Sequence, residues 1–275
     1  MDPTFWDCLH LQFILPPVFD IVFSKHTCLG YDRMFRYLAA TRRAQVSLQQ
    51  FWADQTALWR RTHSREQFTR QNALETMPVC SQSITDRRLL VRNHMAFIVE
   101  NIQYYLQVDV IDSQFCNLLD RIQSDREADL VQVAHEAYLV SLQAQSLLFQ
   151  PTARPCIIRL LSVCQQFVHV TSQSPHSVSD LEERLINDFQ QLSASLFHYL
   201  EISRATGIPA PGVGLDAASS ACRFDQVTRL SADLGQLLLR LDFNHFYSRT
   251  HGDLDVERSN SVAWTNDVEI ALDSR

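Results

Sequence analysis

Several residue types in this sequence could carry chemistry, and their spacing decides which chemistry is feasible. Gly212, Gly214 and Ala217 match the spacing of the G-x-G-x-x-A fingerprint that binds dinucleotides. That fingerprint works only between a strand and a helix, because its glycines bring backbone amides close to a pyrophosphate. Here it follows Ile208 and two prolines, with no predicted strand before it. We therefore predict a flexible loop at this position and no cofactor-binding residues.

Histidine, cysteine and lysine also lack the arrangements that metal binding or nucleophilic catalysis needs. The ten histidines form no pair at helical spacing with a neighbouring carboxylate, and the seven cysteines form no C-x-x-C pair. The H-E-x-x-H, phosphate-loop and G-x-S-x-G signatures are absent, and the single lysine, Lys25, lies beside His26 in a predicted turn. We expect no catalytic residue, no metal site and no cofactor. An enzyme remains as a third hypothesis, which requires a deep pocket assembled from distant residues.

The composition favours an all-α protein. The chain has 275 residues, 46% of them apolar, and its 6 Gly are few for a sheet protein with many tight turns. Its net charge of -7 argues against a nucleic-acid partner, because such partners select strongly basic surfaces. The apolar stretch 11–23 is interrupted by Pro16, Pro17 and Asp20, so we predict no membrane span and no membrane partner. We expect a soluble, intracellular protein with reduced cysteines.

Hydrophobic periodicity predicts an irregular bundle of about seven helices. Apolar and polar side chains alternate over 9–15, which indicates a short strand or an extended segment before the first helix. Apolar side chains then recur every three or four residues from about Gly30 to Arg61, which predicts one long helix. Loops are predicted near 62–85 and 207–220 from their Ser, Thr, Gly and Pro content. Further helices are predicted to begin near Arg92, Asp112, Ser124, Pro155, Ser179 and Phe224.

The segment 92–110 is apolar around most of its circumference. Helical spacing predicts one apolar face, a second face that contains two aromatic residues, and only a narrow polar strip between them. Such a helix is normally central in its bundle, so packing is the default role of Phe97, Tyr104 and Tyr105. The first face contains Met95, Ile98, Val99, Ile102, Tyr105 and Leu106, the second contains Phe97, Asn101, Tyr104 and Val108, and the polar strip contains Arg92, Ala96, Glu100, Gln103 and Gln107.

Three stretches resemble one protein family. The stretch RNHMAFIVENIQYYLQVDVIDSQF, residues 92–115, is similar to the C-terminal conserved region of the γ-tubulin complex components, with the component 4 branch as the nearest likeness. VFDIVFSKHTCLGYDRMFRYLAATRRAQVSLQQFW, residues 18–52, resembles the family's strand and first helix, and LGQLLLRLDFNHFY, residues 234–247, resembles its closing helix and turn. Local departures from the family are Pro16-Pro17, Phe246 and the two expanded loops.

The resemblance implies a non-catalytic helical domain over residues 1–251 that binds γ-tubulin, followed by an acidic, disordered tail over residues 252–275. The implied function is support of microtubule nucleation, with γ-tubulin and other complex components as partners. The implied location is the cytoplasm and cytoskeleton, at a microtubule-organising centre such as a centrosome or spindle pole. Family members also carry an N-terminal half that assembles laterally, so we expect this chain to be a fragment or a short product. The alternative is a helical scaffold that binds other components or adaptors and not γ-tubulin.

Partner-binding residues are predicted from the motif stretches and from charge. Arg42 and Arg43 belong to the stretch 31–70, in which eight Arg face three acidic residues, so an acidic partner surface is conceivable beside the alternative of a solvated helix face. The remaining residues are carried over from the resemblance. The predicted set contains Arg42, Arg43, Arg92, Asn93, Glu100, Asn101, Tyr104, Asp242 and Asn244.

Overall fold

The computed structural model describes residues 9–17, 19, 22–69, 79–124, 128–147, 150, 153–174, 177–206 and 234–249, with side chains from 62–69, 79–83, 128 and 206 left out. The fold is all-α, as predicted, and no strand occurs in the described part of the chain. The predicted loop at 207–220, the helix segment 224–233 and the tail at 252–275 lie outside these residues. No described helix has the length and apolarity needed to cross a membrane.

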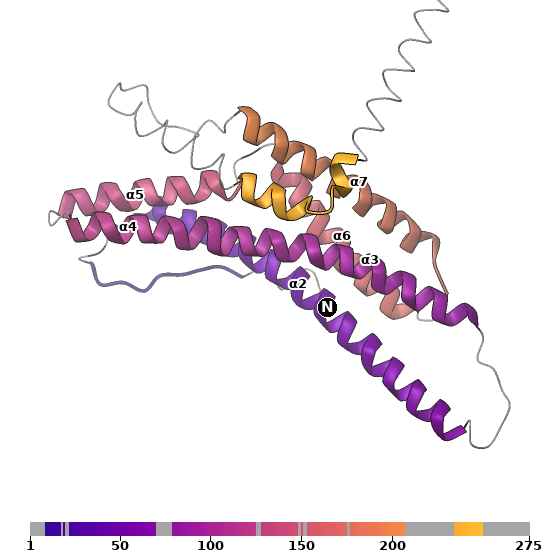
Figure 1. Cartoon of the computed structure of the whole chain (residues 1–275). Helices are drawn as coiled ribbons and strands as arrows, with labels where there is room; N and C mark the ends of the chain where they lie inside the picture. Colours follow the sequence, from indigo (N-terminus) through magenta and orange to yellow (C-terminus); the bar gives the residue numbers. More distant parts are fainter. Residues whose placement is uncertain are drawn as a thin grey trace, which may run out of the picture.

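Helix α2, Lys25–Thr69, is longer than predicted and runs along most of the molecule (Figure 1). It begins five residues before Gly30, where Ser24 Oγ accepts a hydrogen bond of 3.3 Å from the Thr27 backbone N–H and so caps the first turn. Gly30 is not a helix start. A Cβ placed there would lie 2.5 Å from Gln143 Nε2, so glycine allows α2 to approach the helix that carries Gln143.

A continuous helical rod follows, made of α3 (Val79–Tyr104), the π-helix η2 (Tyr105–Asp112) and α4 (Ser113–Ser124). Figure 1 shows α3 returning antiparallel to α2 and leading without a break into α4. The prediction that Asp112 caps a new helix was therefore wrong. The loop predicted at 62–85 is also shorter than expected, because 62–69 continue α2 and 79–85 belong to α3.

Three further long helices complete the bundle: α5 (Ala128–Gln145), α6 (Ala153–Gln173) and α7 (Asp180–Thr206). The described residues 234–241 and 246–249 are also helical. Ser179 Oγ accepts a hydrogen bond of 3.1 Å from the Glu182 backbone N–H, so the predicted N-cap of α7 is confirmed. Ser124 is the last residue of α4, where its hydroxyl donates to the Arg121 carbonyl at 2.9 Å. Ser124 therefore ends α4, while Glu127, the other residue of the predicted capping box, lies outside the described residues.

The segment before α2 runs without regular secondary structure over 9–16, so the alternation of apolar side chains marks an extended segment and not a strand. Asp32 of α2 anchors it, because its carboxylate accepts the Leu11 backbone N–H at 2.8 Å and lies 3.1 Å from His10 Nδ1. The Phe13 ring packs 5.6 Å from the Phe23 ring, measured between centroids. The Asp32 carboxylate and the aromatic contacts of Phe13 thus hold this segment in place of a hydrogen-bonded sheet edge.

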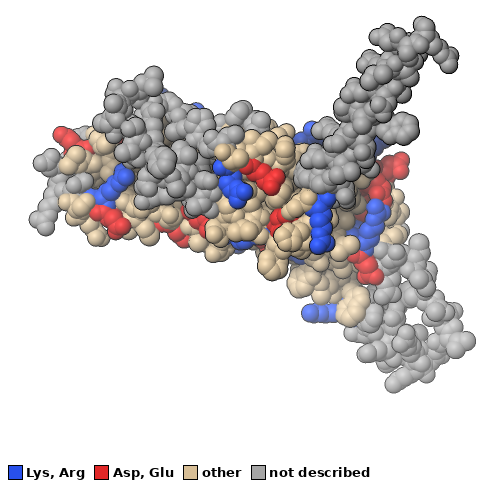
Figure 2. All heavy atoms as spheres, turned by 45° about the horizontal axis from the view of Figure 1, so that its top comes forward, with Lys and Arg blue, Asp and Glu red and all other residues tan. Residues whose placement is uncertain are grey.

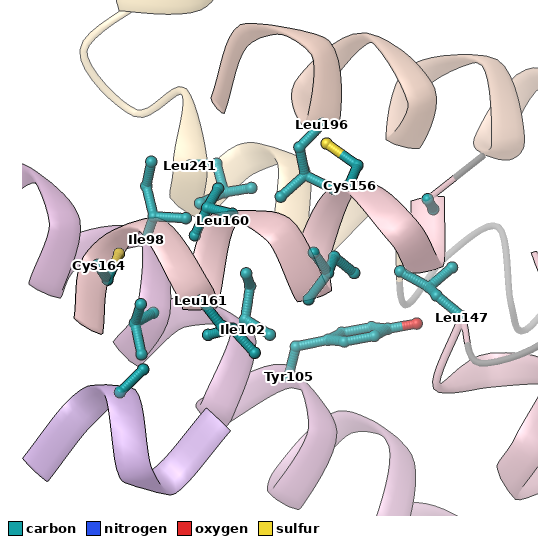
Figure 3. Close-up of a cluster of buried hydrophobic side chains, with 14 of the residues drawn as sticks. Ile98, Ile102, Tyr105, Leu147, Cys156, Leu160, Leu161, Cys164, Leu196 and Leu241 are labelled. Carbon is teal, nitrogen blue, oxygen red and sulfur yellow. The ribbon is translucent and has the colours of Figure 1, made fainter. Parts of the chain in front are cut away.

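The core lies where the rod meets α6, α7 and the helix at 234–241. Figure 3 shows Ile98 and Ile102 of α3 facing Leu160 and Leu161 of α6, with Leu241 closing the cluster. Burial raises the pKa of the Cys164 thiol in this core to about 12, so Cys164 acts as a small apolar side chain and not as a nucleophile. The Tyr105 hydroxyl, also buried, donates a hydrogen bond of 2.8 Å to the Gln145 carbonyl at the end of α5.

A buried ion pair fixes α3 against the start of α7. Arg88 and Glu182 have side chains only 4% and 2% exposed, and two hydrogen bonds of 2.8 and 2.7 Å join their guanidinium and carboxylate. Arg88 Nη2 also donates to the carbonyls of Ser174 and Ser177, both at 2.9 Å, in the connection before α7. Glu182 therefore completes this pair, although the capping-box pattern predicts that it reaches back to its own N-cap.

We expect Arg88→Ala to lower the free energy of unfolding by about 3–5 kcal/mol, because it leaves a buried carboxylate without its partner. Arg87→Ala is the matched control, since Arg87 pairs with exposed Glu183 one residue away on each helix. Urea unfolding monitored by circular dichroism measures both variants. Equal effects of the two substitutions would contradict the stabilising role of the buried pair.

Candidate partner-binding site

The exposed face of α3 differs from the predicted one. The face containing Met95, Ile98 and Ile102 is buried, as predicted, and so is Tyr105, at 1% exposure. The predicted second packing face is instead open to solvent: Phe97 is 41% exposed and Tyr104 is 49% exposed. Two members of the predicted polar strip, Ala96 and Gln103, are buried in its place. The outward strip of α3 therefore contains aromatic and polar side chains together: Asn93, Phe97, Glu100, Asn101, Tyr104, Gln107 and Val108.

The segment 234–249 closes over one edge of this strip. Arg240 forms an ion pair with Asp109 of η2, and its guanidinium carbon lies 4.8 Å from the centre of the Tyr104 ring. This cation–π contact holds Tyr104 in place while leaving half of its surface open. Figure 1 shows the short helix at 234–241, in yellow, lying across the rod. The contact therefore joins two stretches of the chain that are more than a hundred residues apart.

A second aromatic contact joins the closing segment to α3 near Phe97. His94 Nε2 and the Tyr247 hydroxyl share a hydrogen bond of 3.0 Å. The His94 ring also packs edge-on against Phe246, with centroids 5.6 Å apart. Phe97 follows His94 by three residues, so the two side chains lie on neighbouring parts of the same helix face. We call the exposed side chains of Phe97, Tyr104, Phe243 and Phe246 the aromatic patch.

Asp242 and Asn244 shape the turn that presents this patch. Asp242 Oδ1 accepts the backbone N–H of Tyr247 at 2.8 Å, and its carboxylate also accepts the Ser248 hydroxyl. Asn244 Oδ1 accepts the Phe246 N–H at 3.3 Å, while His245 adopts a left-handed backbone conformation with a φ of 57°. Both predicted side chains are thus engaged in local turn bonds, which leave Phe243 in the turn 86% exposed.

Four other predicted residues lie on α3. Arg92 Nε donates a hydrogen bond of 2.9 Å to the Leu48 carbonyl of α2, and burial lowers the pKa of this guanidinium. Arg92 therefore ties the two long helices together. Asn93 accepts a bond of 3.1 Å from Arg92, and Asn101 donates one of 2.8 Å to the Phe97 carbonyl of its own helix. Asn93, Asn101 and the exposed Glu100 share the outward strip with Tyr104.

The two arginines predicted on the first helix lie on α2, away from the motif helix in sequence. Arg42 is exposed and donates a hydrogen bond of 2.6 Å to Gln45 of the same helix, and Arg43 is partly exposed. Figure 2 shows single basic and acidic side chains interspersed over the described surface on this side of the molecule, without a continuous basic face.

The chemical groups near the aromatic patch suit packing and binding better than catalysis. Burial lowers the pKa of His94 and raises that of Tyr247, so both rings stay uncharged at neutral pH. Among the described residues, no group of three or more His, Cys, Asp or Glu could hold a metal ion.

Four residues of the site are missed by sequence reasoning, namely Phe97 as an exposed side chain, and Arg240, Phe243 and Phe246 of the closing segment. The motif 234–247 points to this segment, but its position over Tyr104 is a tertiary contact with no local signal. The sequence does not predict the exposure of Phe97 either, because helical periodicity does not tell which of two apolar faces the bundle covers.

Known proteins are similar to this chain over most of its length. The chain matches the family described as gamma tubulin complex component C-terminal over residues 1–247. It is 33% identical to gamma-tubulin complex component 4 of Homo sapiens over 256 residues, covering 90% of this chain and 32% of that protein. It is 27% identical to gamma-tubulin complex component 4 of Arabidopsis thaliana, covering 92% of this chain and 31% of that protein.

A more distant relative is spindle pole body component 98 of Dictyostelium discoideum, which is 25% identical over 191 residues and covers 68% of this chain and 22% of that protein. The chain therefore spans about a third of the length of its two component 4 relatives, at 32% and 31%. The aromatic patch lies within the matched region, on the motif helix and on the closing segment.

We expect the protein to lose stability as the pH falls below about 6.5, the ordinary pKa of histidine. Burial holds the pKa of folded His94 below that value, so the unfolded chain takes up the proton first and unfolding is favoured until the folded pKa is passed. His94→Gln removes this titration and flattens the fall in melting temperature between pH 7 and 5. The decrease of melting temperature with falling pH should become smaller in this variant but not disappear, because burial also lowers the pKa of His135.

His26→Gln provides the control for this experiment, since His26 is exposed at the start of α2. The fall in melting temperature between pH 7 and 5 should be smaller for His94→Gln than for His26→Gln. Identical slopes for the wild-type chain and His94→Gln would show that His94 does not contribute to acid sensitivity.

Proposed function

Because the chain belongs to the γ-tubulin complex component family and matches its C-terminal region, we propose that it is a non-catalytic module that binds γ-tubulin and supports microtubule nucleation. The observation that carries the proposal is the aromatic patch, which is exposed on the helix that carries the family motif and on the closing segment. The proposed location is the cytoplasm and cytoskeleton, at a microtubule-organising centre such as a spindle pole or centrosome, in line with a relative named as a spindle pole body component. Other γ-tubulin complex components are proposed as further partners.

The aromatic patch has the character of a protein-binding site. Interface centres are enriched in Tyr, Phe and Arg, and binding energy concentrates in a few such residues. Tyr104 is held by Arg240, so it loses little side-chain freedom when a partner covers it. Asn93, Glu100 and Asn101 border the aromatic side chains and supply hydrogen-bonding groups of the kind found at interface rims.

The direct test is binding of purified γ-tubulin to the purified chain, measured by pull-down and by biolayer interferometry. Binding at micromolar concentration supports the proposal. A chain that gives the expected helical circular dichroism spectrum and a cooperative melt, but does not retain γ-tubulin, would count decisively against it.

We expect Tyr104→Ala and Phe97→Ala each to weaken γ-tubulin binding about tenfold, the loss typical of an aromatic side chain at an interface centre. Phe115→Ala is the matched control, because Phe115 is 47% exposed on α4 of the same rod but outside the patch. All three variants should melt within a few degrees of the wild-type chain. If only Phe115→Ala lost binding, the binding site would lie on α4 and not at the aromatic patch.

Charge reversal at Arg42 and Arg43 tests the basic stretch separately. We expect the double variant Arg42→Glu, Arg43→Glu to bind γ-tubulin more weakly at low salt, with the difference shrinking as ionic strength rises, because screening weakens exposed charge pairs. Affinity that does not change at either salt concentration would assign these two arginines to a solvated helix face.

The second candidate function is a helical scaffold that binds other complex components or adaptors without γ-tubulin. The exposed apolar side chains of α5 support this alternative, because they offer a binding surface away from the aromatic patch. Cross-linking mass spectrometry on the assembled complex separates the two functions. Cross-links from the aromatic patch to other components, with none to γ-tubulin, would favour the scaffold.

A further inference from the structure

Helix α5 leaves a regular row of apolar side chains uncovered. Figure 1 shows α5 as an outer helix beside α4, at one end of the molecule. Val133 is 62% exposed, Leu130 is 44% exposed and Val140 is 37% exposed. Ala137 and Ala144 are partly exposed between and beyond them. We call this row the α5 seam; it consists of Leu130, Val133, Ala137, Val140 and Ala144.

The spacing of the α5 seam is that of a helix–helix interface. Its members follow one another at intervals of three, four, three and four residues, which is the spacing of the a and d positions of a heptad. The other side of α5 is already used, because Ala134, Leu139 and Leu142 are buried in the bundle. The α5 seam is thus a second apolar face on a helix whose first face is fully packed.

The charges beside the α5 seam are acidic. Asp129 and Glu136 are exposed and seven residues apart, so both occupy the g position that flanks the seam. No Lys or Arg occurs anywhere in α5, and the e positions, Ala134 and Ser141, carry no charge. A partner helix lying along the α5 seam would therefore face negative charge at the border formed by Asp129 and Glu136. Basic residues of the partner at that border are favourable, and acidic residues are unfavourable.

We propose that the α5 seam binds an amphipathic helix of a partner protein whose apolar face is bordered by Lys or Arg. A second copy of this chain fits less well. Two copies of α5 packed antiparallel would set Asp129 and Glu136 against the same acidic residues of the partner. Two copies packed parallel would set them against uncharged Ala134 and Ser141 and gain no charge complementarity. This proposal is independent of γ-tubulin binding, because the α5 seam shares no residue with the aromatic patch.

The test titrates the full chain against two fluorescein-labelled synthetic peptides of three heptads each, with the same Leu and Ala seam. One peptide carries Lys at its flanking positions and the other carries Glu. Fluorescence anisotropy should show the Lys peptide binding at least about tenfold more tightly than the Glu peptide. Glu136→Lys should reduce or reverse this preference, and because Glu136 is exposed the variant is expected to fold.

Val133→Asp should weaken binding of the Lys peptide about tenfold, because it puts a charge in the middle of the apolar row. Ile158→Asp is the control, since Ile158 is 46% exposed on α6 and outside the α5 seam. Equal binding of both peptides, or binding that survives Val133→Asp, would overturn the proposal. So would self-association in analytical ultracentrifugation that Val133→Asp abolishes, which would assign the seam to a second copy.

Discussion

The rod from Val79 to Ser124 buries one apolar face over its middle part, and the other helices are arranged around that face. Met95, Ile98 and Ile102 of this face are almost completely buried. Helix α2 lies along one flank, where Arg92 binds the Leu48 carbonyl. Helices α6 and α7 complete the core that Figure 3 shows. Because the rod is covered on only part of its circumference, its uncovered strip is available for a partner.

The π-helix in the rod depends on contacts from outside it. Its hydrogen bonds are less favourable than those of an α-helix, so a run such as Tyr105–Asp112 needs tertiary support. The buried Tyr105 hydroxyl binds the end of α5, and Asp109 pairs with Arg240 of the closing segment. The same arginine lies over Tyr104. The closing segment 234–249 therefore contacts both the π-helix and the aromatic patch.

The aromatic patch and the α5 seam are exposed surfaces of different character. The aromatic patch combines Phe and Tyr rings with amide groups and a cation, and it is assembled from α3 and the closing segment. The α5 seam is aliphatic, belongs to one helix and has an acidic border. Because aromatic side chains carry large contact area and aliphatic heptads favour another helix, the two surfaces suit different kinds of partner. They are separate in sequence, so a substitution in one leaves the residues of the other unchanged.

Periodicity and capping chemistry are local, so the sequence by itself determined the all-α class, the buried face of the motif helix and the start of α7 at Ser179. The same reasoning failed where distant contacts override local preference. Asp112 looks like a cap but lies inside a continuous rod, and Gly30 looks like a helix start but allows α2 to approach α5. Only the tertiary structure decided that Phe97 and Tyr104 face solvent while Gln103 is buried. Helical spacing defines which residues share a face, but the neighbouring helices determine which face is covered.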